Sequence, residues 1–198
     1  QRTSWLLGVG VSLFYLCFHS YFLNFDGVAC DMAVEIGDFK HLVHGNHLAY
    51  GLVGWAFFSL WRLLGYQGQA LLALQTLDGF INGAAVGVFY LALRRAEIRP
   101  RVALGACLGL AVSYAYWLWS LEVQGYQLGV LVMAFTLREA LSPRPRAALL
   151  GLWQGAAVLT HIGHALFAPA AAFVLWRRGG LNRCRALARW AAAGSALV

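Results

Sequence analysis

Hydrophobic residues form long unbroken runs along most of this chain. Four such runs cover roughly residues 5–23, 70–93, 102–121 and 147–176. A helix of about 20 apolar residues is long enough to cross a hydrocarbon core of about 30 Å. The pattern therefore predicts an all-α fold, a polytopic transmembrane helical bundle.

Composition agrees with this pattern. The 198 residues are 61% hydrophobic and 12% charged, whereas soluble domains have about 45–50% apolar and about 25% charged residues. We therefore expect an integral membrane protein. No linker or repeat divides residues 1–198, which predicts a single transmembrane domain. The chain has no initiating Met and its last apolar run, from Ala186, stops at Val198. We expect an N-terminal part of a larger protein.

The arginines set the expected topology, because loops rich in Lys and Arg remain in the cytoplasm. The net charge is +7, and the arginines fall between apolar runs: Arg94, Arg95, Arg99 and Arg101; Arg138, Arg144 and Arg146; Arg177, Arg178, Arg183, Arg185 and Arg189. This distribution indicates cytoplasmic loops rather than a nucleic-acid surface, and it places the N-terminus in the cytoplasm. The first run then crosses outward, residues 24–69 lie outside, and residues 70–93 return.

Two segments need separate treatment in this topology. The run 147–176 begins and ends beside arginines, so it is predicted to form two short spans with an outer turn at "THIGH" (160–164). The segment Tyr50–Leu64 has only about fifteen residues and contains Trp55, Trp61 and Arg62. It is predicted to lie in the outer interface, or to be shallowly re-entrant, since amphipathic helices of this kind rest at membrane surfaces.

This topology gathers most of the acids and the histidines on the outer face. The first outer loop holds Asp26, Asp31, Glu35, Asp38, His41, His44 and His47; the shorter connections hold Glu122, His161 and His164. Solvated charges scattered at random would not avoid the cytoplasmic loops so consistently. The sequence therefore predicts an outer-face site at the membrane boundary.

The first outer loop offers the best candidate for acid–base chemistry. In "DMAVEIGD", Asp31 and Glu35 are spaced i, i+4, and Asp38 is one turn further; on a helix the three would share a face. A carboxylate there can act as a general base toward a hydroxyl. The alternative is a solvated face of an interfacial helix.

The other polar groups allow several interpretations. His41, His44 and His47 could ligate a divalent metal, bind a phosphate, or make structural hydrogen bonds; we predict no cofactor and no metal site. Glu122 in "YWLWSLEVQGYQLGVL" could line a site or form a salt bridge or helix cap, because an acid between apolar spans is costly unless paired or useful. Asp78 and Asn82 are expected to make hydrogen bonds between helices.

The order of these motifs resembles that of the GT-C superfamily of polytopic glycosyltransferases, especially bacterial relatives of protein O-mannosyltransferases. An outward span precedes the acidic "FDGVACDMAVEIGD", then "HGNHLAYGLVGWAFFSLWRLLG", the span "ALLALQTLDGFINGAAVGVFYLALRR", the link "SYAYWLWSLEVQGYQL" and the hairpin "GAAVLTHIGHALFAPAAAFVLWRR". The resemblance covers most of residues 1–190. Many relatives carry His-Pro where this chain has His44-Gly45.

This resemblance implies a function and a set of site residues. Such enzymes transfer a sugar from a polyprenyl-phosphate donor at the outer (periplasmic) face, here of a bacterial inner (plasma) membrane. Asp31 best matches their base, with Asp26 as the rival. The pocket would be lined by Glu35, His44, His47, Tyr50, Glu122 and His161. The alternative is a non-catalytic membrane protein, either a lipid-binding or carrier protein or a subunit of a membrane assembly.

Overall fold

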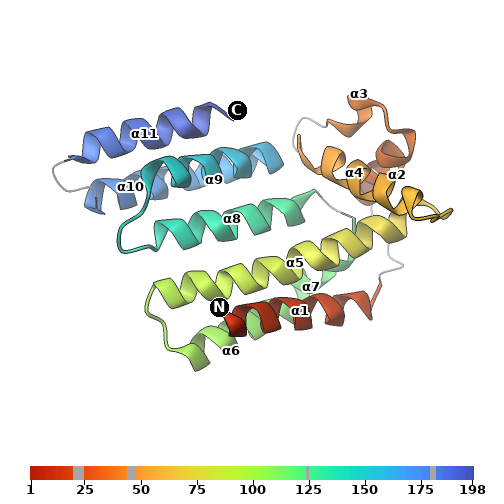
Figure 1. Ribbon diagram of the computed structural model, residues 1–198, viewed down its shortest axis with the longest axis horizontal. Helices are drawn as coiled ribbons and strands as arrows, with labels where there is room; N and C mark the ends of the chain where they lie inside the picture. Colours follow the sequence, from red (N-terminus) through yellow and green to blue (C-terminus); the bar gives the residue numbers. More distant parts are fainter. Residues whose placement is uncertain (20–24, 44–47, 124, 179–181) are drawn as a thin grey trace.

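A computed structural model describes residues 1–19, 25–43, 48–123, 125–178 and 182–198 of the chain, and every regular element within them is helical (Figure 1). In order, the helices are α1 (Arg2–Leu16), α2 (Phe25–Ile36), α3 (Phe39–Leu42), α4 (Tyr50–Leu63), α5 (Ala70–Arg95), α6 (Pro100–Ala111), α7 (Tyr114–Leu121), α8 (Tyr126–Ala140), α9 (Ala147–Thr160), the 3₁₀ helix η1 (Ile162–Phe167), α10 (Ala168–Arg178) and α11 (Arg183–Ser195). The predicted all-α class is confirmed.

The 26-residue helix α5 organises the bundle, with α1 against one side and α8 against another (Figure 1). Small residues on α5 allow α1 to approach closely. A Cβ placed on Gly83 would lie 2.5 Å from the Gly8 carbonyl oxygen and 2.0 Å from Ser12 Oγ. Any larger residue at Gly83 would therefore push α1 and α5 apart, as expected where small residues set a helix–helix distance.

Helices α8, α9 and α11 continue the layer beyond α5 (Figure 1). Glycines again mark the closest approach, here between α9 and α11. A Cβ on Gly151 would lie 2.2 Å from the Trp190 carbonyl oxygen, and one on Gly155 would lie 2.5 Å from the Gly194 carbonyl oxygen. The GxxxG spacing of Gly151 and Gly155 thus sets the position of α11.

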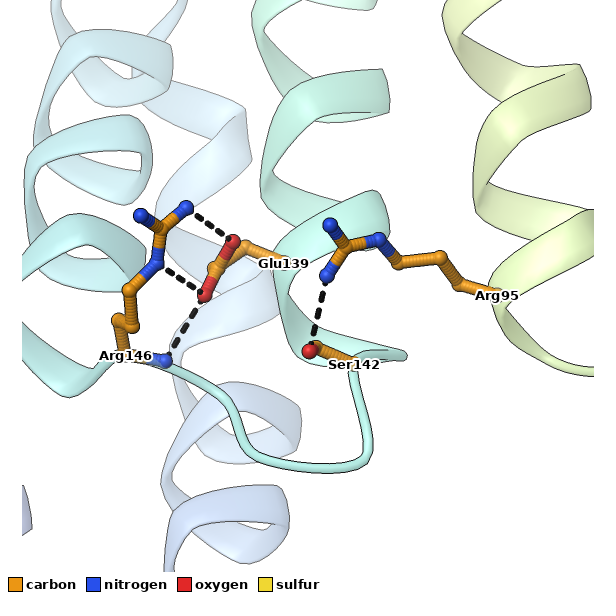
Figure 2. Close-up of polar contacts among 4 residues, drawn as sticks. All are labelled: Arg95, Glu139, Ser142 and Arg146. Atoms are coloured by element: carbon orange, nitrogen blue, oxygen red, sulfur yellow. Dashed lines mark hydrogen bonds and ion pairs between the residues drawn. The ribbon is translucent and has the colours of Figure 1, made fainter. Parts of the chain in front are cut away.

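Arginines hold one end of the bundle together, which we call the arginine end (Arg95, Glu139, Ser142, Arg146 and Arg178). Arg95 of α5 donates to Ser142 Oγ at 2.8 Å, and Arg146 at the start of α9 pairs with Glu139 of α8 (Figure 2). Arg178 of α10 donates to the carbonyl oxygens of Ala140, at 3.2 Å, and Ser142. Helices α5, α8 and α10 therefore end here, and α9 begins here.

The opposite end, which we call the acidic end, is where α5 begins and where α2, α3 and α4 lie (Figure 1). The Gln75 amide donates to the Leu121 carbonyl at 3.2 Å. The Ala49 N–H, just before α4, donates to the Leu159 carbonyl near the end of α9 at 3.3 Å. The predicted grouping of the outer segments, away from most of the arginines, is thus present in the bundle.

The predicted spans are only partly present as continuous helices. In the described residues, α5 is the one helix long and apolar enough to cross a membrane, and 67% of its apolar window is buried. Joined together, α6 and α7 would give a second, but they bend by 57°. The prediction of an unbroken helix over 102–121 is therefore wrong. At the break, Ser113 is extended (ψ 139°) and its hydroxyl donates to the Leu110 carbonyl, a local bond that competes with helix.

The remaining runs give shorter helices than predicted. Helix α1 has 15 residues and ends at Leu16, whereas the run continues toward residue 23. The run 147–176 does break at "THIGH", because α9 ends at Thr160 and η1 follows. Since α9 begins and α10 ends at the arginine end, the predicted turn between them is confirmed. That the two helices are membrane spans with an outer turn stays a prediction. Helix α4 has 14 residues, and its placement in an interface stays a prediction.

Candidate functional site at the acidic end

Asp31 on α2 has the most unusual environment of the predicted site residues. Its side chain is half-buried, and its Oδ1 atom is buried with no hydrogen-bond partner among the described residues. Burial, followed by the negative charge of Glu35 one turn later, raises the pKa of Asp31 from 3.8 to about 6. A carboxyl with such a pKa still ionises near neutral pH, and it is then a stronger base than an ordinary aspartate.

Glu35 makes a structural contact that the sequence does not predict. Its Oε1 atom accepts a hydrogen bond from the Ala70 N–H at 2.8 Å, across 35 residues of chain. That N–H belongs to the first residue of α5, whose first-turn amides have no partner within the helix. A carboxylate is also favoured there by the helix dipole. Glu35 therefore caps α5 and fixes α2 against it.

The other two acids of this loop lie apart from Asp31 and Glu35. Asp26 is exposed in the first turn of α2. Asp38 does not continue the α2 face, because α2 ends at Ile36 and Gly37 adopts a left-handed backbone with φ +68°. Asp38 instead caps α3 and lies 3.3 Å from His41 Nδ1. The expected face shared by Asp31, Glu35 and Asp38 is thus wrong for Asp38.

Tyr50 and Asp78 form a buried pair beneath α2. The Tyr50 hydroxyl donates to Asp78 Oδ2 at 2.8 Å and links α4 to α5. Burial and the Asp78 charge raise the pKa of Tyr50 well above its usual value, so the hydroxyl keeps its proton. The pKa of Cys30 is raised to about 11 by burial and by the charges of Asp78, Asp26 and Asp31. Asp78, Asp26 and Asp31 therefore all lie close enough to Cys30 for their charges to act on its thiol.

An apolar cluster lies under this group and brings four segments together. It includes Val34 of α2, Tyr50 of α4, Leu74 of α5 and Val123 of the α7–α8 link. Glu122, the neighbour of Val123, is itself buried. Glu122 thus belongs to the same end of the bundle as Asp31, as the sequence predicts.

His161 lies beside α8, where aromatic rings continue the site. Its ring centroid lies 5.1 Å from that of Tyr126, and Tyr126 lies 6.1 Å from Trp119. His161 Nδ1 accepts from the Gly163 N–H at 3.0 Å, so this nitrogen carries no proton. Burial and the neighbouring His161 lower the pKa of His164. The neutral form of His164 is therefore favoured, and the His161 ring lies against the aromatic ring of Tyr126.

Next to these rings a cavity of about 510 Å³ opens between α5, α6–α7 and α8. Its walls are mainly apolar, with Tyr116, Trp119 and Tyr126 prominent, and the polar residues Asn82 and Gln127 also line it. Such a cavity suits a ligand with a large apolar part and a few polar groups.

Some of the predicted residues cannot be placed in this site. His44 and His47 lie outside the described residues. Within the described ranges, no group of three His, Cys, Asp or Glu side chains could hold a metal ion.

Several polar residues of the bundle were not singled out from the sequence. Gln75 and Gln127 are buried, and the Gln127 amide donates to the Trp119 carbonyl. Tyr116 donates to the Asn82 carbonyl at 3.0 Å, while the Asn82 amide bonds the Asp78 carbonyl within its own helix. The expected hydrogen bonds between helices are thus made by Asp78 and by the backbone of Asn82. A search for amides within apolar runs would have found Gln75 and Gln127.

Comparison with known proteins gives no relative for this chain: no protein-family model, no curated protein and no solved structure matches it. The geometry of the residues themselves therefore carries the functional argument.

Proposed function

We propose that this chain is part of a GT-C-type membrane glycosyltransferase, in which Asp31 is the general base. One observation carries the proposal: a half-buried carboxyl with a raised pKa, one of whose oxygens is buried without a hydrogen-bond partner in the described chain. A base must reach the acceptor hydroxyl at about 2.6–3.2 Å, directly or through one water. The oxygen of Asp31 has the unsatisfied capacity that such a contact needs.

The proposal includes a multi-pass placement in a bacterial inner membrane, with the arginine end in the cytoplasm. Its support is the apolar surface of the outermost helices. On α1, Trp5, Leu6, Val9 and Leu13 are exposed; on α6, Val102 and Leu108 are exposed. Large apolar patches of this kind mark contact with lipid or protein. Helices of 14 or 15 residues would require local thinning of the bilayer.

In this reaction a polyprenyl-phosphate sugar binds at the acidic end. The acceptor oxygen forms a bond to the anomeric carbon while Asp31 takes the hydroxyl proton. The bond from that carbon to the phosphate oxygen breaks, and the lipid phosphate leaves with the electron pair. Tyr50, Glu122 and His161 would lie around the reacting groups, with Asp26 as the alternative base. The 510 Å³ cavity would hold the start of the prenyl chain.

A second candidate is a non-catalytic lipid-binding or carrier protein, or a subunit of a membrane assembly. The observation that favours it is the same cavity, since mainly apolar walls of this size can bind a lipid without any chemistry. In that case the carboxyls of the acidic end would serve only to hold helices together, as Glu35 does.

The test is sugar transfer in the full-length protein, with labelled polyprenyl-phosphate sugars and isolated membranes. Removing a general base typically costs about 10²–10⁴ in rate. Asp31→Asn should lose transfer by that order while donor binding persists, and Asp38→Asn should retain it. Loss with Asp26→Asn alone would make Asp26 the base. Full activity in both variants would contradict the enzyme proposal and leave the carrier.

A further inference from the structure

A second cavity, of about 430 Å³, lies at the other end of the molecule between the first turns of α9 and α11. Arg146 lines it at the start of α9, followed by Ala147 and Ala148. Arg185 and Arg189 line it from α11, spaced one helical turn apart. Helices α9 and α11 thus place three arginines around one cavity, and small side chains lie between these arginines.

The charges around this cavity are unbalanced. Among the residues that the structure describes, no carboxylate lines it, and neither α9 nor α11 has an acid in its first turn. Glu139, the acid that pairs with Arg146, is already held there: its Oε1 accepts from the Arg146 N–H at 2.8 Å and its Oε2 from the guanidinium at 3.3 Å. Cations are unfavourable at helix N-termini, where anions are favoured. Arg185 and Arg189 are exposed, and an anion in this cavity would lie between their positive charges and the start of α9.

Phosphate is the anion whose chemistry fits best. Arginine presents a planar fork of N–H donors that binds two phosphate oxygens at once. Arg185 and Arg189, spaced i, i+4 on α11, offer two such forks. Opposite them lie Ala147 and Ala148 in the first turn of α9, where backbone N–H groups have no partner within the helix. The alanines leave room for a substituent on the phosphate. A carboxylate ligand would satisfy fewer of these donors.

We infer that the cavity formed by Arg146, Arg185 and Arg189 binds the phosphate group of an anionic ligand. The phosphate belongs either to a lipid headgroup or to a soluble compound. This site lies at the arginine end, so it does not depend on the proposed glycosyl transfer at the acidic end.

The experiment uses the full-length protein in nanodiscs of phosphatidylcholine, with phosphatidylglycerol added in one arm and inorganic phosphate in the other. Bound lipid is measured by native mass spectrometry, and phosphate affinity by calorimetry. Arg185→Gln with Arg189→Gln removes the charge-assisted hydrogen bonds of both guanidinium groups, so it should weaken binding about tenfold or more. The matched control is Arg99→Gln with Arg101→Gln, which removes the same charge at arginines that do not line the cavity.

A further variant guards against misfolding of the double mutant. Ala148→Glu places an acid in the first turn of α9, where it should raise the unfolding temperature and displace phosphate from the cavity. Selective binding of phosphatidylglycerol assigns the site to lipid, and binding of inorganic phosphate alone assigns it to a soluble ligand. Equal loss in the Arg99/Arg101 control, or unchanged binding in both the Arg185/Arg189 and Ala148 variants, would overturn the inference.

Discussion

The two ends of the bundle treat a buried carboxyl in opposite ways. At the arginine end, the side chain of Glu139 is 2% exposed and receives the backbone N–H and the guanidinium of Arg146 (Figure 2). At the acidic end, Asp31 has another acid, Glu35, as its strongest charged neighbour, and Asp78 has a tyrosine hydroxyl. The Glu139 carboxylate is paired with an arginine, so it serves to hold helices together. The Asp31 carboxyl has another acid as its charged neighbour and binds a proton more readily, so it can accept a proton in a reaction.

The largest expected effect is a difference in transfer rate between a variant at the acidic end and a variant at the arginine end. Under the proposed function, Asp31→Asn lowers transfer by about 10²–10⁴, whereas Glu139→Gln leaves the rate per folded molecule within a few-fold. Rates normalised to folded protein in the same membranes test this. Equal losses in the two variants would mean that Asp31 acts only on stability.

The next largest expected effect is a loss of stability at the arginine end, caused by Glu139→Gln. The substitution removes the charge that receives the Arg146 N–H and guanidinium, and hydrogen bonds to charged groups contribute about 1.5–3 kcal/mol. We expect a loss of that size in the free energy of unfolding, measured by denaturant titration in detergent. The control is Glu97→Gln, an exposed acid near the end of α5, expected to stay within about 0.5 kcal/mol.

A smaller loss is expected within the acidic end when its neutral hydrogen bond is removed. Tyr50→Phe leaves the buried Asp78 without its 2.8 Å hydroxyl donor, which should cost about 1–2 kcal/mol. Tyr66→Phe is the matched control, because its hydroxyl makes an exposed bond to the Gln69 carbonyl at 3.0 Å. Equal thermal shifts in the two variants would show that burial of the Tyr50–Asp78 pair is unimportant.

The smallest effect is a pH dependence of stability at Asp31. Its pKa is raised on folding from 3.8 to about 6, so the folded state binds more protons than the unfolded state in this window. The stability contributed by the protonated form is full below 3.8 and is lost as pH rises through about 6. Solvent screening of this half-exposed group keeps the change within about 1 kcal/mol. Asp31→Asn should therefore flatten the unfolding temperature between pH 4 and pH 7; a decline as steep as that of the unmodified protein would contradict this origin.

Most of the helices were predictable, because a helix is the simplest way for a long apolar run to hydrogen-bond its own backbone N–H and C=O groups. The arginine clusters also predicted which helix ends meet, as the contacts of Arg95 and Arg178 illustrate. The break between α6 and α7 was not predictable from hydrophobicity, since Ser113 is a single small residue in an apolar run. Its effect depends on a local hydrogen bond to Leu110 rather than on the pattern.

The candidate site was predictable as a group of residues but not as a set of contacts. Asp31 and Glu35 are neighbours on α2 by spacing alone. The partner of Glu35 is 35 residues away, and that of Tyr50 is 28 residues away. No periodicity encodes such distant pairs. Glu139 shows the reverse case, because its partner Arg146 is only seven residues further along the chain. An ion pair across the turn between them could have been predicted from the sequence.

The bond between Glu35 and the Ala70 N–H also has a consequence for the order of folding. The first amide of α5 is protected by a side chain that arrives only when α2 docks, whereas the amides in the middle of α5 are protected as soon as that helix forms. Slow hydrogen–deuterium exchange at Ala70 therefore reports the docking of α2 and not the formation of α5. If α2 opens independently of the bundle, Ala70 should exchange at the rate of that opening, long before the central turns of the same helix.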